Sequence, residues 1–242
     1  MRALLLAAGY GTRLRPLTDH TPKCLVSVNG RPLLDYWFDL LFEAGVERIL
    51  VNTHYLAEQV RAHVASTPFH DCVDLVHEEV LLGTGGTILA NRDWAGGAPL
   101  LVAHADNLTD FPVRELIDAH RGRPHDVVLS MLTFRTDDPS SCGILELGEN
   151  GLVRAFYEKA AQPPGNLANA AVYVIDPEVF DLMASFNRET IDFSTEVIPL
   201  LMNRIQALDI ARYHRDIGTP EALAKAQDEF PIRSVAGAFK AQ

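Results

Sequence analysis

Residues 2–23 read RALLLAAGYGTRLRPLTDHTPK, and this stretch decides the fold that we expect. It opens with the apolar run Ala3–Ala8, which is much shorter than the roughly 20 residues of a membrane span and is followed by Gly9 and Gly11. We therefore predict a buried first strand rather than a transmembrane segment or a cleaved leader. Apolar residues at helical spacing follow in 31–44, so the order is strand, long loop, helix.

Strands and helices continue to alternate after this unit, which is typical of a parallel sheet with helices on both faces. A strand-rich middle section then predicts an antiparallel extension. We expect an α/β fold, a Rossmann-like three-layer sandwich with a mostly parallel central sheet and a small antiparallel extension. The expected strands are 48–52, 73–77, 99–103, 126–134, 143–147, 153–157, 170–175 and a segment around 210–213, and the expected helices are 31–44, 56–64, 177–183, 195–203 and 220–230.

Composition and charge exclude several classes of protein. With 242 residues, 48% hydrophobic and 22% charged, the chain is long enough and apolar enough for one domain, which we place at 1–230, with a tail at 231–242. The net charge of −11 argues against a nucleic-acid partner. Three dispersed cysteines form no C-x-x-C pair, which favours a reducing cytoplasm, and we expect no membrane partner.

The loop after the first strand combines small residues with cations. Gly9 and Gly11 allow backbone N–H groups to approach phosphate oxygens, and Arg13, Arg15 and Lys23 can neutralise their charge. No glycine is followed by lysine, so the loop is not a P-loop. Leu14 stands where the dinucleotide fingerprint needs its third glycine, so that class is excluded as well. The loop therefore predicts a site for a polyphosphate.

Gly9-Tyr10-Gly11-Thr12-Arg13-Leu14-Arg15-Pro16-Leu17-Thr18, followed by Pro22-Lys23, resembles the signature G-x-G-T-R-x-x-P-x-T…P-K of the sugar-1-phosphate nucleotidyltransferases. The resemblance implies the nucleotide-diphospho-sugar transferase fold. It also implies that Arg13 and Lys23 act in catalysis on the phosphates. The nucleotide-binding residues that it implies in this loop are Leu6, Ala7, Ala8, Gly9, Gly11, Thr12, Arg13 and Lys23.

Two further parts of the chain are similar to the family's nucleotide and metal segments. Leu82-Gly83-Thr84-Gly85-Gly86 resembles its base-binding loop, which adds Glu78, Gly83 and Thr84 to the implied nucleotide site. Asp106 ends a buried strand, and Asp216 lies in a D-I-G-T-P-E segment; the resemblance makes both of them Mg²⁺ ligands and Asp106 catalytic. Ala105 replaces a usual glycine beside Asp106.

The implied sugar-phosphate site comes from the second half of the chain. Glu158-Lys159 resembles the family's E-K pair, and Asn169 resembles the asparagine of N-[AT]-G-x-Y, with Ala171 in place of glycine. Gly143 matches the glycine that leaves room for the sugar, and Asn107 follows the metal-binding Asp106. The expected sugar-phosphate ligands are Asn107, Gly143, Glu158, Lys159 and Asn169.

The resemblance implies a Mg²⁺-dependent enzyme of nucleotide-sugar biosynthesis for cell envelope polysaccharide. It would join a nucleoside triphosphate to a sugar 1-phosphate and release pyrophosphate. The run 78–86 favours GTP with mannose- or heptose-1-phosphate. UTP with N-acetylmuramate-1-phosphate and dTTP or UTP with glucose-1-phosphate stay open, as do a glycosyltransferase that consumes a nucleotide sugar and a non-catalytic sensor. Similar enzymes are often homodimers.

Overall fold

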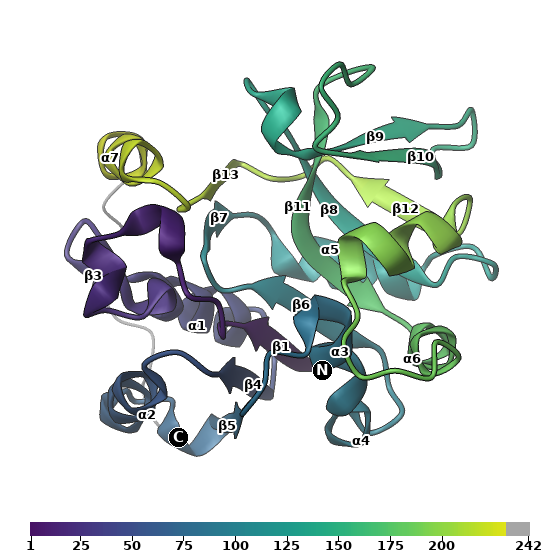
Figure 1. Ribbon diagram of the computed structural model, residues 1–242. Helices are drawn as coiled ribbons and strands as arrows, with labels where there is room; N and C mark the ends of the chain where they lie inside the picture. The colour runs from purple at the N-terminus through teal and green to yellow at the C-terminus, as the bar shows by residue number, and fades with distance from the viewer. Residues whose placement is uncertain (231–242) are drawn as a thin grey trace.

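The computed structural model describes residues 1–230, so the expected tail at 231–242 lies outside the described residues. It confirms the α/β fold. In the central sheet, β6–β1–β4–β5 run parallel, whereas β11 pairs antiparallel with β6 and β8 (Figure 1). The nine strands are β1 (Arg2–Leu6), β4 (Arg48–Thr53), β5 (Val73–His77), β6 (Leu100–His104), β8 (Leu129–Arg135), β9 (Gly143–Leu147), β10 (Val153–Glu158), β11 (Leu167–Ile175) and β12 (Ile205–Leu208).

Helices cover both faces of the sheet and bury it on each side. Ala3 and Leu5 of β1 belong to a core formed with α1, α2 and α5, whereas Leu4 belongs to a second core formed with α3, α4 and α6. Both faces of β1 are therefore dry, which explains its unbroken apolar run. The helices are α1 (Leu33–Glu43), α2 (Ala57–Ser66), α3 (Gly83–Ala90), α4 (Arg92–Ala95), α5 (Val113–Arg121), α6 (Pro177–Ala184) and α7 (Pro220–Glu229).

A third, smaller core holds the loop after β1 in place. Leu14, Val26 and Leu33 pack there with Ile217 and Phe230, so the first and last parts of the described chain meet. Figure 1 draws α7 beside the loop that follows β1. Short segments complete this region: the strand pair β2 (Ser27–Val28) and β3 (Arg31–Pro32), the pair β7 (Asn107–Asp110) and β13 (Tyr213–Asp216), and the 3₁₀ turns η1 (Thr12–Leu14), η2 (Leu17–Asp19) and η3 (Lys23–Leu25).

Two expected elements are wrong in detail. The segment 195–203 is not one helix: a π-turn, η6 (Phe193–Val197), is followed by a 3₁₀ turn, η7 (Ile198–Leu201), and Pro199 in the first turn of η7 cannot donate a helical hydrogen bond. The strand expected around 210–213 begins only at Tyr213, because Ile210 packs on the first core and β13 is aligned by its pairing with β7.

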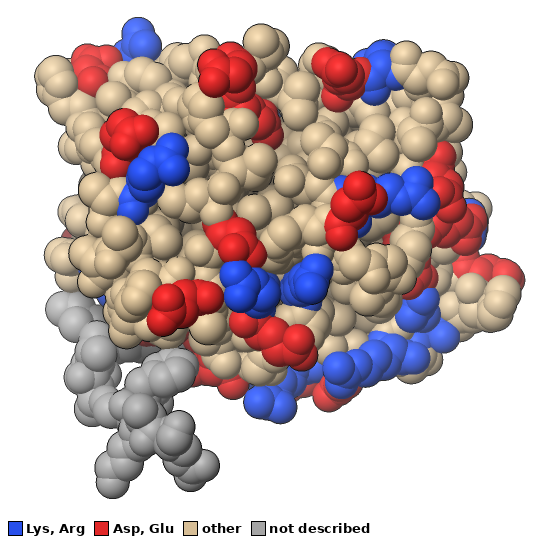
Figure 2. All heavy atoms as spheres, turned by 90° about the horizontal axis from the view of Figure 1, so that it is seen from below, with Lys and Arg blue, Asp and Glu red and all other residues tan. Residues whose placement is uncertain are grey.

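On the face drawn in Figure 2, side chains of both charges occur, and several arginines and lysines lie beside aspartates and glutamates. Within residues 1–230, no helix is long and apolar enough to cross a bilayer.

Candidate active site

The loop after β1 is fixed by contacts at both of its ends. The Ala7 N–H donates to Asn52 Oδ1 at 2.7 Å, and the Thr18 hydroxyl donates to the Gly11 carbonyl at 2.7 Å. Gly11 has a φ of 63°, and a Cβ there would lie 2.9 Å from Thr18 Cγ2, so this position requires glycine. A Cβ at Gly9 would meet nothing within 4 Å, which leaves open space above the loop.

Three of the residues implied for catalysis and metal binding lie together, although they are far apart in sequence. Lys23 Nζ donates to Asp106 Oδ2 at 2.6 Å and to Asp216 Oδ1 at 3.0 Å, and its side chain is only 9% exposed. Arg13 adds a contact of 3.2 Å to Asp216 Oδ2. Gly218 leaves room for that pair, since a Cβ would lie 2.7 Å from the arginine and 2.8 Å from the carboxylate. The β7–β13 pair aligns Asp216 with Asn107, next to Asp106.

The charges of this cluster stabilise one another. Burial opposes ionisation of Asp106, but the Lys23 ammonium, the nearby His104 and hydrogen bonds together outweigh it and lower the pKa of the carboxyl. Burial also disfavours the charged form of Lys23, yet Asp106 and Asp216 together raise its pKa. The charged forms of Asp106 and Lys23 therefore stabilise each other.

The two carboxylates fit a divalent cation in donor type and position. Both are hard oxygen donors, and both point at one shared location, the Lys23 ammonium. No group of three or more His, Cys, Asp or Glu side chains suited to a metal occurs within 1–230. Mg²⁺ would accordingly take its remaining ligands from water and phosphate oxygens, which is its usual habit in enzymes.

The residues implied for the sugar phosphate come from several strands: Asn107 lies on β7, Gly143 on β9, Glu158 at the end of β10 with Lys159 directly after it, and Asn169 on β11. Gly143 leaves room for the Glu158 carboxylate, since a Cβ would lie 2.7 Å from Glu158 Oε2. Lys159 lies 3.7 Å from Glu158 and is exposed. Asn169 is held at both ends of its amide: its Nδ2 donates to the Tyr173 hydroxyl at 2.7 Å, and its Oδ1 accepts from the Ala171 N–H at 2.8 Å. These contacts fix the orientation of the amide.

Two residues of the implied site have their side chains occupied within the protein. Asn107 is buried, and its Nδ2 donates to the Ala170 carbonyl at 3.3 Å, so it ties β7 to β11. Glu78 is buried as well, and its carboxylate accepts from Asn52 Nδ2 at 2.8 Å, the Thr87 hydroxyl at 2.6 Å and the Leu82 N–H at 3.2 Å. Both side chains therefore hold neighbouring strands and loops of the implied site in place.

Sequence reasoning missed Asn52, Thr87 and Tyr173. Asn52 joins the Glu78 carboxylate to the Ala7 amide, so one side chain aligns two loops. A signal was present, because Asn52 is the polar end of an otherwise apolar strand, where ligand sites of α/β sheets gather. Tyr173 is the tyrosine of the N-[AT]-G-x-Y pattern, so the motif marked its position, but only the fold shows that its hydroxyl contacts Asn169.

The glycines of the segment 83–86 have a packing role. The Gly85 and Gly86 N–H groups donate to the Ile191 carbonyl at 2.8 and 3.1 Å, and a Cβ at Gly86 would lie 2.1 Å from the Glu189 carbonyl. Thr84 Oγ1 accepts from the Phe193 N–H at 2.8 Å. The segment 189–193 therefore closes over the start of α3.

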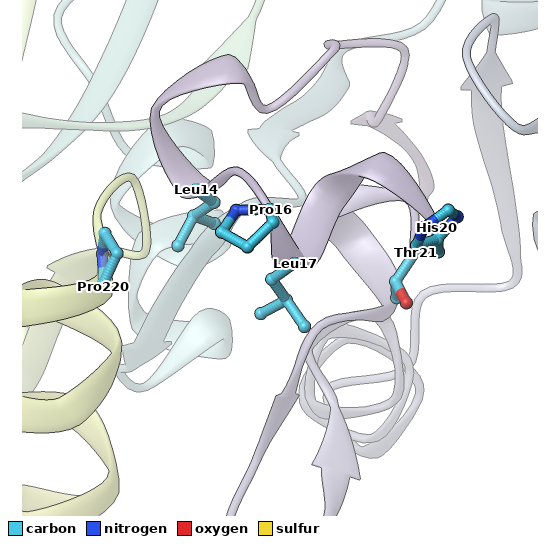
Figure 3. A pocket seen from close by; sticks show the side chains of 6 residues that line it. All are labelled: Leu14, Pro16, Leu17, His20, Thr21 and Pro220. Atoms are coloured by element: carbon cyan, nitrogen blue, oxygen red, sulfur yellow. The ribbon is translucent and has the colours of Figure 1, made fainter.

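An apolar pocket of about 490 Å³ lies beside the loop rather than in the charged cluster. Figure 3 labels the six side chains that line it: Leu14, Pro16, Leu17, His20, Thr21 and Pro220. None of them is a residue implied for nucleotide, sugar or metal, so the pocket is separate from the charged cluster.

Comparison with known proteins agrees with the geometry. A model of the family described as nucleotidyl transferase matches residues 2–231. Mannose-1-phosphate guanylyltransferase catalytic subunit beta of Drosophila melanogaster is 33% identical over 232 residues, which cover 91% of this chain and 60% of that protein. Mannose-1-phosphate guanyltransferase of Saccharomyces cerevisiae is 30% identical over 229 residues, with coverage of 91% and 62%. The chain thus spans about 60% of the length of these relatives.

Solved structures share the whole fold. A crystal structure of HddC from Yersinia pseudotuberculosis has a TM-score of 0.80 at 25% identity and covers 95% of this chain and 99% of its own. A structure of the same protein complexed with GMP-PN has a TM-score of 0.79 at 26% identity, with the same coverage. An apo UDP-glucose pyrophosphorylase, at 21% identity and a TM-score of 0.79, covers 94% of this chain and 96% of its own and supports the fold alone.

Proposed function

The chain belongs to the nucleotidyl transferase family, and from that premise we propose that it transfers a nucleotidyl group from a nucleoside triphosphate to a sugar 1-phosphate. The proposal rests on one observation, the cluster that Lys23 forms with Asp106 and Asp216 after the Gly-rich loop. Two anions must meet in this reaction, and the cluster provides fixed charges of both signs where they would meet.

In the proposed reaction an oxygen of the sugar phosphate attacks the α-phosphorus, the new P–O bond forms, and the bond to the β-phosphate breaks to release pyrophosphate. No general base is needed, because the attacking oxygen is already ionised near neutral pH. Arg13 suits the leaving pyrophosphate through its fork of donors, and Lys23 suits the α-phosphate as a compact charge. Asp106 and Asp216 would hold Mg²⁺, which would neutralise charge on the phosphate oxygens.

Glu158, Lys159 and Asn169 are proposed to bind the sugar phosphate. Glu158 offers a carboxylate to sugar hydroxyls, and the exposed Lys159 ammonium is free to turn toward the phosphate. Asn169 has a fixed amide that can accept or donate one further hydrogen bond. The loop residues Leu6 to Thr12 and the segment at Gly83–Thr84 are proposed to enclose the nucleotide.

For the substrates we propose GTP with mannose-1-phosphate, and we keep heptose-1-phosphate beside it. The names of the relatives support this choice, since several are mannose-1-phosphate guanylyltransferases at about 30% identity. UTP with N-acetylmuramate-1-phosphate and dTTP or UTP with glucose-1-phosphate are the alternatives. We also propose a cytoplasmic location, a homodimer, and a role in supplying cell envelope polysaccharide.

The test is magnesium-dependent pyrophosphate release with five triphosphates (GTP, UTP, dTTP, CTP and ATP) crossed against five sugar 1-phosphates (mannose, glucose, heptose, N-acetylglucosamine and N-acetylmuramate). GTP with mannose-1-phosphate should give the strongest signal. Asp106→Asn should lower turnover by about 10²–10³, the usual cost of losing one charge-stabilising group. Asp181→Asn is the matched control. Asp181 on α6 pairs with the exposed Arg92 on α4, and neither residue belongs to the proposed site.

Two other results would decide against the proposal. No release with any pair, from folded protein that still binds a nucleotide, would favour a sensor. Sugar transfer from a nucleotide sugar without pyrophosphate release would favour a glycosyltransferase. Light scattering in solution tests the homodimer independently of either result.

A further inference from the structure

The Lys23 ammonium has two sets of partners in the proposed site, the carboxylates that it contacts and the phosphate that it is proposed to bind. Lys23 Nζ contacts Asp106 Oδ2 and Asp216 Oδ1, and the proposed function also gives it the α-phosphate. Asp216 is engaged on both of its oxygens, because Arg13 contacts Oδ2 at 3.2 Å. The two carboxylates that we assign to a divalent cation therefore already have cationic partners from the protein.

The ammonium lies where the carboxylates converge. A cation that bridges Asp106 and Asp216 at this point would use the two oxygens that now contact Lys23, Asp106 Oδ2 and Asp216 Oδ1. Two positive charges in one position repel strongly where solvent is partly excluded. Lys23 is only 9% exposed, so water screens that repulsion poorly. The cation and the ammonium thus compete for one position.

We propose that Lys23 is an exchangeable counter-ion of the Asp106–Asp216 pair, which releases the carboxylates to a divalent cation and takes a nucleotide phosphate as its new partner. The assignment of cation and nucleotide rests on the proposed function. A buried ammonium that leaves two carboxylates needs another anion, and a phosphate supplies one. Divalent cation and nucleotide therefore bind with positive coupling, and each raises the affinity for the other by the same factor.

The exchange predicts the direction in which cation affinity changes when Lys23 is removed, and other roles of Lys23 predict a different direction or no change. A lysine that binds phosphate from a position away from the two carboxylates would leave cation affinity nearly unchanged when it is removed in the absence of nucleotide. A lysine that only supports the structure would lower cation affinity when it is removed. An exchangeable counter-ion lowers cation affinity while it is present, so its removal raises that affinity.

The first test is calorimetric titration of the full chain with Mg²⁺ and no nucleotide. Lys23→Met keeps the apolar stem and removes the charge, and it should bind Mg²⁺ about tenfold more tightly than the wild type. Lys225→Met on α7 is the matched control and should equal the wild type. Equal or weaker binding by folded Lys23→Met overturns the proposal, as does the absence of Mg²⁺ binding in both proteins.

The second test uses the wild type, so it holds if Lys23→Met does not fold. The chain has only four lysines, at 23, 159, 225 and 240, so ¹³C labelling of their ε-carbons gives a simple NMR spectrum. Mg²⁺ alone should shift the Lys23 signal and leave that of Lys225 in place, and Lys23→Arg identifies the signal. An unmoved Lys23 signal overturns the exchange. Pyrophosphate release is measured separately, so an active enzyme with a fixed Lys23 signal refutes the exchange and keeps the proposed function.

Discussion

At the scale of single residues, Ala171 shows what the sequence could and could not reveal. Its place in Asn169-Ala170-Ala171-Val172-Tyr173 marks a departure from the family's glycine, and the structure gives it a φ of 52°. The cause is a register shift between β11 and β8, where Asn169 opposes Thr133 and Tyr173 opposes Met131. The motif identified the position, but the left-handed backbone depends on strand pairing, which one sequence does not show.

Ala171→Gly should stabilise the protein. An L-residue in the left-handed region costs about 1 kcal/mol, and glycine removes most of that cost. We expect the free energy of unfolding in urea to rise by about 0.5–1 kcal/mol. Ala168→Gly is the matched control on the same strand: Ala168 is fully buried with no positive φ, so its replacement should destabilise the protein. A loss of stability in Ala171→Gly would contradict the assignment of strain to this residue.

Tyr173 is a positioning residue, since its hydroxyl contacts Asn169 rather than the expected sugar. Tyr173→Phe removes one of the two contacts that hold the Asn169 amide, so the KM for the sugar phosphate should rise about fivefold, the value of one hydrogen bond, while kcat changes little. Steady-state kinetics in both substrates measure this. Tyr36→Phe removes a similar bond, to the Val28 carbonyl at 2.9 Å, and should leave both constants unchanged. An unchanged KM in Tyr173→Phe would refute the positioning role.

At the scale of elements, the sequence predicted the strands of the parallel core better than the segments that cross over the site. The segment 48–52 contains the apolar run that a buried strand requires, and 73–77 mixes apolar and polar residues, as suits β5 at the edge of the sheet. Strands β4 and β5 match both expected ranges closely. Helix α3 was not expected, because a start as rich in glycine as 83–86 has low helix propensity. Its stability comes from tertiary contact with the segment 189–193, which no local pattern encodes.

Gly86→Ala tests that contact. The added Cβ would lie 2.1 Å from the Glu189 carbonyl, a backbone atom that cannot rotate away. Although alanine is the better helix former, we expect a loss of about 2 kcal/mol in unfolding free energy from the forced shift of the segment. Gly165→Ala is the control, since a Cβ there meets nothing within 4 Å. A stability equal to the wild type would mean that the segment moves aside without cost.

At the scale of the whole molecule, one buried histidine joins both layers of helices to the sheet. His120 of α5 is 1% exposed, with Nδ1 2.7 Å from the Ser130 hydroxyl of β8 and Nε2 3.4 Å from Asp176, which precedes α6. Gln206 of β12 donates to the same hydroxyl at 2.6 Å. The arrangement has the members of a Ser-His-Asp triad, but Ser130 is fully buried, so no substrate reaches it and the network is structural.

This network should make stability depend on pH. Burial and the Arg123 guanidinium outweigh the attraction of Asp176 and lower the pKa of His120 to about 4. The unfolded chain, in which histidine titrates near 6.5, therefore binds more protons between pH 6.5 and 4. The contribution of His120 to the free energy of unfolding is complete above pH 6.5. It is lost as the pH falls toward 4, and the loss reaches about 3 kcal/mol. Urea unfolding at several pH values measures this slope. His120→Gln should reduce the slope by about half, because burial lowers the pKa of His214 to about 4 as well. The exposed His125→Gln should keep the slope, and an equal slope in all three proteins would place the pH sensitivity in groups other than His120.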